Sequence, residues 1–511
     1  NRIKFFTKIS IFCIDASRPV SYNYQQFNLE RMLSAMVSKS KKKACIFCVL
    51  LSSCIISSMV QTALNTALAL IMEEMSVSAG TAQWLASSYS LVMGIMVLST
   101  AFLIRRYPSR PLYLSFMSLF SLGLLLAALS PSFWVLLLGR VLQAVGCGLL
   151  MSLTQVVILS VYPPETRGSV MGLYGLAVCA APVLAPTLTG IIIDSMGWQM
   201  VFWIALGASV ITLGIGFFTM GNVTETTPIS FDILSLLLCA AGFAGLVVGL
   251  GNWSSYKIVS VPVLGLVVGG LGFLLLFVKR QQQLSVPFLN LKAFANLEFR
   301  LSVLSSMLIY CSMMAVSTLL PLYNQSLRGV SATTSGLIMM PGSLVTALIS
   351  PVAGKIHDRF GIRKLYLIGG FLILTGHISF CLLTTDTPVA IISVLFLVRQ
   401  LGIGMLMMTT VTWGMSTLQG EMISDGTAII SSLRTVSGAI GSAVFVSIMS
   451  AVAGRSAVAG RSAVAGRSDV AAMMCGIRAA FAGIALLSAV LFLLAVLCIG
   501  RKKTVTAERS S

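Results

Sequence analysis

The sequence predicts an all-α integral membrane protein with about fourteen transmembrane helices. Two observations lead to this fold class. Hydrophobic residues make up 57% of the 511 residues and charged residues only 10%, whereas a soluble domain carries about 25% charged residues. The apolar residues also gather in blocks close to the ~20 residues that a helix needs to cross a bilayer. Lipid is therefore expected to be the main solvent.

The apolar blocks, divided at their polar breaks, give fourteen predicted spans in two series. The first eight are 45–72, 82–104, 112–130, 133–161, 169–193, 198–220, 231–252 and 258–278. The other six are 300–324, 335–356, 364–384, 387–415, 426–450 and 474–500. We expect residues 1–44 to form a cytoplasmic segment, with 1–31 a leader without function, and residues 501–511 to form a cytoplasmic tail.

An internal repeat divides the spans further. RYPSRPLYL at Arg106–Leu114 returns as RFGIRKLYL at Arg359–Leu367, and a second pair of similar segments places Arg140 opposite Arg399. Such self-similarity indicates repeated structural units. We infer an N-terminal six-helix half, an inserted helix pair and a C-terminal six-helix half, at 45–220, 231–278 and 300–500.

Lys and Arg residues are unevenly divided between the two sides of the membrane. From Lys39 onward, twenty fall in segments on the side of the N-terminus and five on the other, Lys257, Arg328, Arg455, Arg461 and Arg467. Cytoplasmic loops carry the positive excess. We therefore expect a multi-pass protein of the cell membrane with both termini in the cytoplasm.

Patterns for catalysis or cofactor binding are nearly missing from the sequence. The two histidines, His357 and His377, have no metal-ligand spacing around them. Gly354-Lys355 lacks the first glycine of a phosphate-binding loop. The basic residues lie between apolar blocks and form no stripe with aromatic residues, which argues against nucleic acid. We expect no enzyme activity, no cofactor and no metal site.

Four arginines lie inside predicted spans, where a charge costs roughly 2.5–3.5 kcal/mol on insertion scales. They are Arg140, Arg399, Arg434 and Arg478. For Arg140, which precedes Gln143 and two small residues, we favour a functional role facing a polar cavity over a structural pairing. For Arg399 and Arg434 both interpretations stay open, and Arg478 is expected to extend from a helix end.

Polar residues of the first, second and fourth spans are candidates to bind a substrate. They are Gln61, Asn65, Gln83, Tyr89 and Gln143. Facing lipid would be costly for them, and hydrogen bonding between helices is the alternative. The 26 methionines either form an adaptable wall for apolar ligands or, as we favour here, face lipid.

The fifth predicted span contains Gly175, Pro182, Pro186 and Gly190. Each proline removes a backbone hydrogen bond and bends the helix. We favour a pliable helix at the interface between the two halves, as a rocking transporter requires. A passive kink is the alternative.

Several of these segments resemble motifs of the major facilitator superfamily. LLLGRVLQAVGCG, which contains Arg140, resembles its fourth-helix arginine motif, GLYGLAVCAAPVLAPTLTG its antiporter signature, and GKIHDRFGIRK its basic loop. QTALNTAL at 61–68 and AQWLASSYSLVMGI at 82–95 are similar to fourteen-span drug:proton antiporters, especially lincomycin-resistance-type exporters. The resemblance, over about residues 45–500, implies the major facilitator fold, drug export and a proton-coupling role for Arg140.

The sequence departs from the family pattern at acids associated with proton coupling. Val60 stands where many members have an intramembrane acid, and Arg105 where the first basic loop usually has one. The C-terminal basic loop keeps its acid, Asp358, next to Arg359. Neighbouring positive charge should hold Asp358 ionised and suit it to gating.

Two further acids at span borders, Asp194 and Asp232, have no basic neighbours in the sequence. We expect them to titrate more readily and to be candidates for carrying the proton.

Taken together, the residues and the resemblance predict a secondary transporter that exports small amphipathic compounds, such as drugs and antibiotics, by proton antiport. Its expected partners are the lipid bilayer, the amphipathic substrate and protons. Two alternatives stay open. One is a proton-coupled importer of the same fold, and the other is a membrane sensor or decayed transporter that moves no substrate.

Overall fold

The computed structural model describes residues 19–162, 164–223, 232–252, 260–284, 289, 291–419, 422–459 and 467–497. These residues are almost entirely helical, and none of them is in a β-strand.

Fourteen long helices follow one another along the described residues. They are α2 (Pro19–Glu74), α4 (Trp84–Arg106), α5 (Ser109–Ala128), α6 (Phe133–Val161), α7 (Pro164–Met196), α8 (Gln199–Thr219), α9 (Ile233–Gly251), α10 (Val261–Gln283), α11 (Leu297–Leu322), α12 (Ala332–Phe360), α13 (Ile362–Cys381), α14 (Val389–Ser416), α15 (Met422–Ala459) and α16 (Arg467–Leu497). Short helices α3 (Ala79–Ala82), η2 (Leu291–Ala295) and η3 (Tyr323–Leu327) lie between them.

Each of the fourteen predicted spans corresponds to one long helix, so the predicted fold class is confirmed. Thirteen described segments are long and apolar enough to cross a membrane, and α7 adds the shorter apolar segment Leu184–Met196. Helix α7 continues through both of its prolines, Pro182 and Pro186.

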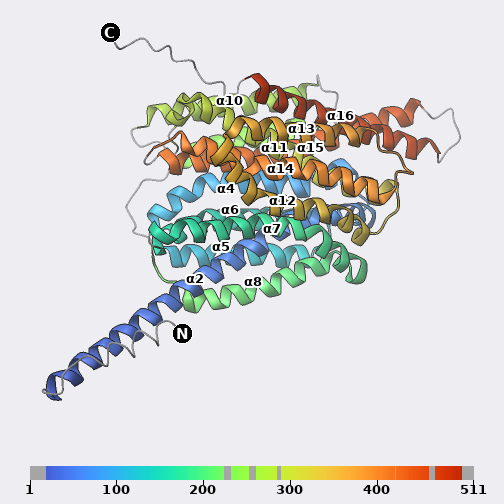
Figure 1. Cartoon of the computed structure of the whole chain (residues 1–511). Coiled ribbons are helices and arrows are strands. Elements are labelled where there is room, and N and C mark those ends of the chain that lie inside the picture. The colour runs from blue at the N-terminus through green and yellow to red at the C-terminus, as the bar shows by residue number, and fades with distance from the viewer. Residues whose placement is uncertain are drawn as a thin grey trace, which may run out of the picture.

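The helices form two adjacent groups (Figure 1). Helices α2–α8 make up the N-terminal half and α11–α16 the C-terminal half. The halves meet where α4 packs against α15, α7 against α12 and α2 against α11. The pair α9 and α10 packs together, with α9 against α15 and α4 at the outside of this interface.

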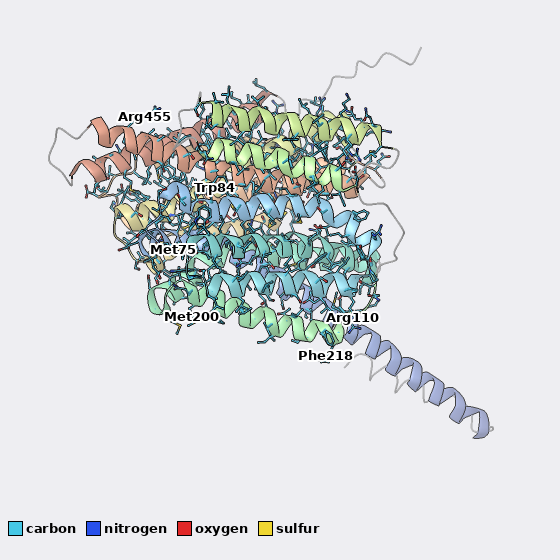
Figure 2. All side chains as sticks on the ribbon, turned by 180° about the vertical axis from the view of Figure 1, so that it is seen from behind. Met75, Trp84, Arg110, Met200, Phe218 and Arg455 are labelled. Atoms are coloured by element: carbon cyan, nitrogen blue, oxygen red, sulfur yellow. The ribbon has the colours of Figure 1, made fainter. Side chains whose placement is uncertain are left out.

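The two ends of the bundle can be named by residues labelled in Figure 2. Met75 and Met200 lie toward one end, which we call the Met75 end, and Arg110 and Phe218 lie at the opposite, Arg110 end. Helix α2 is 56 residues long and extends beyond the bundle at the Arg110 end. The expected boundary at residue 44 therefore falls inside a continuous helix.

Small residues allow the helices to approach closely, as in α5 and α6. A Cβ atom on Gly123 would lie 2.6 Å from the backbone nitrogen of Gln143, and one on Gly139 would lie 2.9 Å from that of Ala127. Both distances are too short for any larger side chain. This backbone contact is typical of membrane helices, whose association depends on close packing.

Candidate functional site

A cavity lies between the two halves. Its wall comes from α2, α4, α6 and α7 of the N-terminal half and from α11, α12, α14 and α15 of the C-terminal half. The empty space between the atoms is about 1090 Å³, which includes space open to solvent. Ligand sites of helical bundles commonly lie between the helices in this way.

Methionine is the most frequent residue of the cavity wall. Seven of them contribute to it, Met93, Met151, Met313, Met314, Met339, Met407 and Met408. For these seven, the expectation that methionine faces lipid is wrong. Their flexible, polarisable thioethers give the cavity an apolar surface that can adapt to different shapes.

Arg140 is fully buried inside the N-terminal half, and it is not part of the cavity wall. Its guanidinium donates hydrogen bonds to the carbonyl oxygens of Val60 (3.1 Å) and Gln61 (3.4 Å) on α2 and of Leu85 (3.3 Å) on α4. The expectation that Arg140 faces the cavity is therefore wrong, because backbone carbonyls of two packed helices supply its acceptors. Arg140 instead fixes α2, and with it Gln61, against α6.

Gln143 and Tyr89 complete the surroundings of Arg140. Gln143 accepts a hydrogen bond from Arg140 (2.9 Å) through Oε1 and donates to the carbonyl oxygen of Gly123 (2.9 Å) through Nε2. The Tyr89 ring lies 4.1 Å below the guanidinium carbon, a cation–π contact. Both candidates thus contact Arg140 rather than the cavity.

Of the five polar residues expected to contact substrate, Gln61 is in the cavity wall and the other four are not. Asn65 donates to Ser317 Oγ (3.0 Å) of α11, and Gln83 donates to Ser87 Oγ (3.0 Å). The alternative interpretation, hydrogen bonding between helices, describes the position of Asn65. Gln83 instead bonds to a residue four positions along the same chain segment.

Arg399 occupies the corresponding place in the C-terminal half, but it does line the cavity. Its Nε donates to His377 Nε2 (2.8 Å), Nη1 to Gln400 Oε1 (2.8 Å) and Nη2 to the carbonyl oxygen of Ser312 (3.1 Å). On its other side, His377 Nδ1 lies 2.7 Å from Ser488 Oγ. Among the described hydrogen bonds of Arg399, none is to a carboxylate.

Arg434 on α15 also lines the cavity. Its guanidinium carbon lies 5.2 Å from the centre of the Tyr310 ring on α11, and its buried Nε has no hydrogen-bond partner. Gln61 Nε2, from the other half, donates to the Tyr310 hydroxyl at 3.3 Å. Tyr310 thus stands between a side chain of each half.

Sequence reasoning did not identify His377 and Tyr310 as members of this site. Both lie in apolar stretches without a motif. The available signal was Arg399, because a buried guanidinium needs acceptors and His377 is a polar residue on a neighbouring span.

Helix α7 packs against α12 at the interface between the halves, and its pliability stays a prediction. Pro182 and Pro186 line the cavity. Toward the Met75 end, a Cβ on Gly190 would lie 2.5 Å from the carbonyl oxygen of Ala332, and Thr187 Oγ1 donates to the carbonyl oxygen of Gly336 (3.0 Å). Around Gly175, by contrast, nothing lies within 4 Å of the corresponding Cβ position.

Asp194 connects the two halves at the Met75 end. Its carboxylate accepts hydrogen bonds from the backbone N–H groups of Ala332 (3.1 Å) and Thr333 (2.7 Å) at the start of α12. The first backbone N–H groups of a helix have no partners within the helix, and the helix dipole favours a negative charge there. Partial burial acts to raise the pKa of Asp194, but hydrogen bonds from Thr333, Ser331 and Ala332 outweigh it and lower that pKa below its usual range. The expectation that Asp194 titrates readily is therefore wrong for this closed contact.

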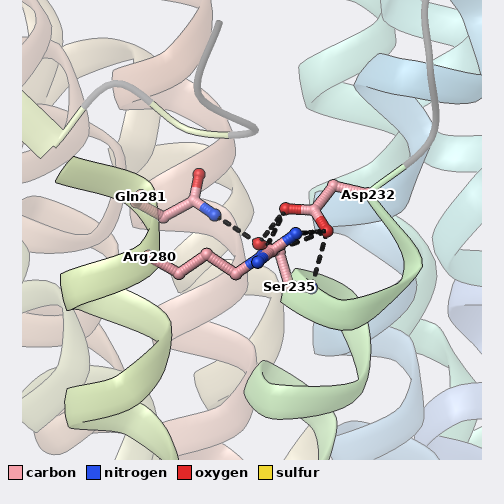
Figure 3. A network of polar contacts seen from close by, with 4 residues as sticks. All are labelled: Asp232, Ser235, Arg280 and Gln281. Atoms are coloured by element: carbon pink, nitrogen blue, oxygen red, sulfur yellow. Dashed lines mark hydrogen bonds and ion pairs between the residues drawn. The ribbon is translucent and has the colours of Figure 1, made fainter. Parts of the chain in front are cut away.

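Asp232 is part of an ion pair between the start of α9 and the end of α10 (Figure 3). The Arg280 guanidinium donates to both carboxylate oxygens, the shortest contact being 2.8 Å, while Ser235 donates from its backbone and its hydroxyl. Gln281 donates to Ser235 Oγ (2.6 Å). The Arg280 hydrogen bonds lower the pKa of Asp232 to about 2. The expectation that Asp232 has no basic neighbour and titrates readily is wrong.

Among the remaining candidates, Arg359 and Arg478 are not part of the described cavity wall. Asp358 belongs to α12, but its side chain is outside the described residues, and Arg359 is exposed. Arg478 donates to the carbonyl oxygen of Leu383 at 3.0 and 2.8 Å. The gating role of Asp358 and Arg359 stays a prediction.

Comparison with known proteins assigns the chain to a family. A family model described as Major Facilitator Superfamily matches residues 50–442. The chain belongs to this superfamily. It is therefore a multi-pass membrane transporter by family.

Relatives and solved structures agree with this assignment. The chain is 39% identical over 419 residues to the uncharacterized MFS-type transporter YcnB of Bacillus subtilis (strain 168), covering 82% of this chain and 89% of the relative. It is 37% identical over 428 residues to the lincomycin resistance protein LmrB of the same organism, covering 82% and 88%. The crystal structure of a bacterial homolog of the human lysosomal transporter Spinster, at 15% identity, has a TM-score of 0.63 over 89% of this chain and 97% of that one, which shows the shared fold.

Proposed function

We propose that the protein exports small amphipathic compounds, including drugs and antibiotics, across the cell membrane by proton antiport. The observation that carries this proposal is the cavity between the halves, with its seven methionines beside two arginines. An adaptable apolar wall with a few polar groups suits varied amphipathic ligands. Similarity to a protein named for lincomycin resistance supports drug export.

Alternating access requires the halves to separate at one end and meet at the other. In this structure Thr187, Gly190 and Asp194 of α7 contact α12 at the Met75 end. These contacts must break when the cavity opens there. Pro182 and Pro186 lie between that end and the Arg110 end, where a helix without two backbone hydrogen bonds can bend.

We assign the proton-sensitive step to Asp194. A carboxylate that accepts two backbone N–H hydrogen bonds loses acceptor strength when it is protonated. The hydrogen bonds of the closed contact lower the pKa of Asp194, so the proton is taken up when α7 and α12 separate and these donors are lost. With the Met75 end outside, a proton from the outer side would then keep the contact from re-forming and favour the state open to that side. This is the direction of exchange that proton antiport requires.

The first experiment identifies a cargo. A host that lacks its own drug pumps, with and without the full chain, is tested for sensitivity to a panel of compounds that includes lincomycin. We expect raised tolerance to a subset of amphipathic compounds. Equal sensitivity to the whole panel would support the sensor or decayed-transporter alternative.

The second experiment tests coupling with that cargo in proteoliposomes. We expect transport to stop when the pH gradient is dissipated, and Asp194→Asn to uncouple transport more than Glu508→Gln does. Equal transport with and without a gradient would contradict proton antiport. Comparison of inverted with right-side-out vesicles separates export from import.

A further inference from the structure

The cavity is positively charged. Arg399 and Arg434 line it, and its described wall contains no aspartate or glutamate. The acceptors that hold Arg399, His377 Nε2, Gln400 Oε1 and a backbone carbonyl, carry no negative charge that could neutralise it. A charge away from bulk water is not favourable without compensation. No described wall residue therefore supplies a negative charge to compensate Arg399 and Arg434.

Arg434 is the group with free donor capacity. Within the described part of the chain its guanidinium contacts the Tyr310 ring, and its buried Nε donates to no acceptor. A buried donor without an acceptor is costly, more so when the group is charged. A ligand oxygen that accepts from Arg434 would relieve that cost and place the ligand beside Tyr310.

We propose that the cavity selects amphipathic organic anions. A carboxylate or sulfonate pairs with Arg434, and an aromatic body lies against the methionine wall, since thioether sulfur makes favourable contacts with aromatic rings. A cation of the same shape meets two like charges and no carboxylate, and a neutral compound leaves Arg434 uncompensated. This inference rests on the proposed function, because it takes the cavity as the cargo site.

Three ligands with one aromatic body test the selection: 1-naphthaleneacetate, 1-naphthaleneacetamide and 1-naphthylmethylamine. Binding to the full chain in lipid nanodiscs is measured by calorimetry, at one pH and without any gradient. We expect the carboxylate to bind at least ~10-fold more tightly than the amide, as for a charge-assisted hydrogen bond. The amine should bind most weakly.

Variants of α15 identify the charge responsible. Arg434→Gln should bring the affinity for the carboxylate down to that for the amide, whereas Arg434→Lys should keep a preference for the anion. Arg455→Gln is the matched control, because Arg455 is an exposed arginine on the same helix and outside the cavity wall. It should bind all three ligands like the parent protein.

Three outcomes would overturn the proposal: the amine binding as tightly as the carboxylate, an unchanged anion preference in Arg434→Gln, or no binding of the carboxylate at millimolar concentration. Because binding is measured at equilibrium without a gradient, a failure of proton coupling or of export leaves this result unaffected. Conversely, lost anion selectivity would leave the efflux experiments valid.

Discussion

Arg140 and Arg399 occupy matching places in the two halves, but their surroundings differ. Arg140 is enclosed by carbonyl oxygens of α2 and α4, whereas Arg399 reaches the cavity wall and contacts His377. A guanidinium presents five donors in a fixed plane and keeps its charge when buried. Related residues can therefore brace helices in one half and charge the cavity in the other.

We expect both Arg140→Ala and Arg140→Lys to abolish transport while the protein still inserts. The alanine variant leaves buried carbonyl groups and Gln143 without their donor, which should destabilise the fold by about 1–3 kcal/mol. Lysine has three donors on one atom and cannot reach acceptors on two helices. Transport at matched membrane abundance and thermal stability in detergent are the measurements.

Arg455→Lys serves as the control, since that arginine is exposed. Near-normal transport by either Arg140 variant would show that Arg140 contributes packing alone.

The arginines buried within the spans could be recognised in the sequence, but the direction in which each side chain points could not always be predicted. Arg140, Arg399 and Arg434 stand out because a charge inside an apolar span is costly. Whether each faces the cavity or a neighbouring helix depends on helix rotation and packing, which a single sequence does not give. Gln61 and Asn65 lie about one turn apart on α2, yet only Gln61 lines the cavity.

At the scale of elements, the contact between α7 and α12 makes a prediction about glycine. Gly190→Ala would bring a Cβ to 2.5 Å from the carbonyl oxygen of Ala332, so the two helices must shift apart. We expect a transport rate at least ~10-fold lower, equivalent to about 1.4 kcal/mol, at matched abundance.

Gly175→Ala, on the same helix, is the matched control because open space surrounds its Cβ position. Equal losses in the two variants would point to helix propensity or local flexibility and not to the contact with α12.

The ion pair between α9 and α10 makes a prediction about pH. Because the pKa of Asp232 is lowered from 3.8 to about 2, its contribution to stability is present above the ordinary pKa and is lost as the pH falls toward 2. Between pH 5.5 and 7.5 the carboxylate stays ionised. Asp232→Asn should therefore lower stability by at most about 1 kcal/mol, equally at both pH values.

The pH profile of transport should also be unchanged in Asp232→Asn. A pH profile of transport that differs between this variant and the parent protein would show that Asp232 takes part in proton coupling.

Hydropathy was sufficient to predict all fourteen long helices, because crossing a bilayer demands an apolar segment of fixed minimum length. It did not predict that α2 continues far beyond its span, since helix continuation into water depends on local propensity. It also did not reveal the Asp232–Arg280 pair, whose partners are 48 residues apart and meet because α9 and α10 run antiparallel.

For the whole molecule, twenty basic residues against five predict that the Arg110 end faces the cytoplasm. A tag placed after Ser511 should resist external protease in intact cells and become cleavable after permeabilisation. Cleavage without permeabilisation would show that the orientation is the opposite one. The side from which Asp194 is proposed to take up a proton would then also be reversed.

The positive charge of the cavity predicts that steps of the proposed transport cycle depend on the membrane potential. Moving one elementary charge through the membrane potential changes the energy by about 2.3 kcal/mol per 100 mV. In the proposed cycle, opening the cavity to the opposite side of the membrane would change where Arg399 and Arg434 lie in the electric field, and the proposed anionic cargo would cancel one of their two charges. In planar-bilayer recordings, the protein without cargo should therefore give a larger transient current than the protein with bound cargo. The conformational change of the empty protein should be the step whose rate depends most on voltage.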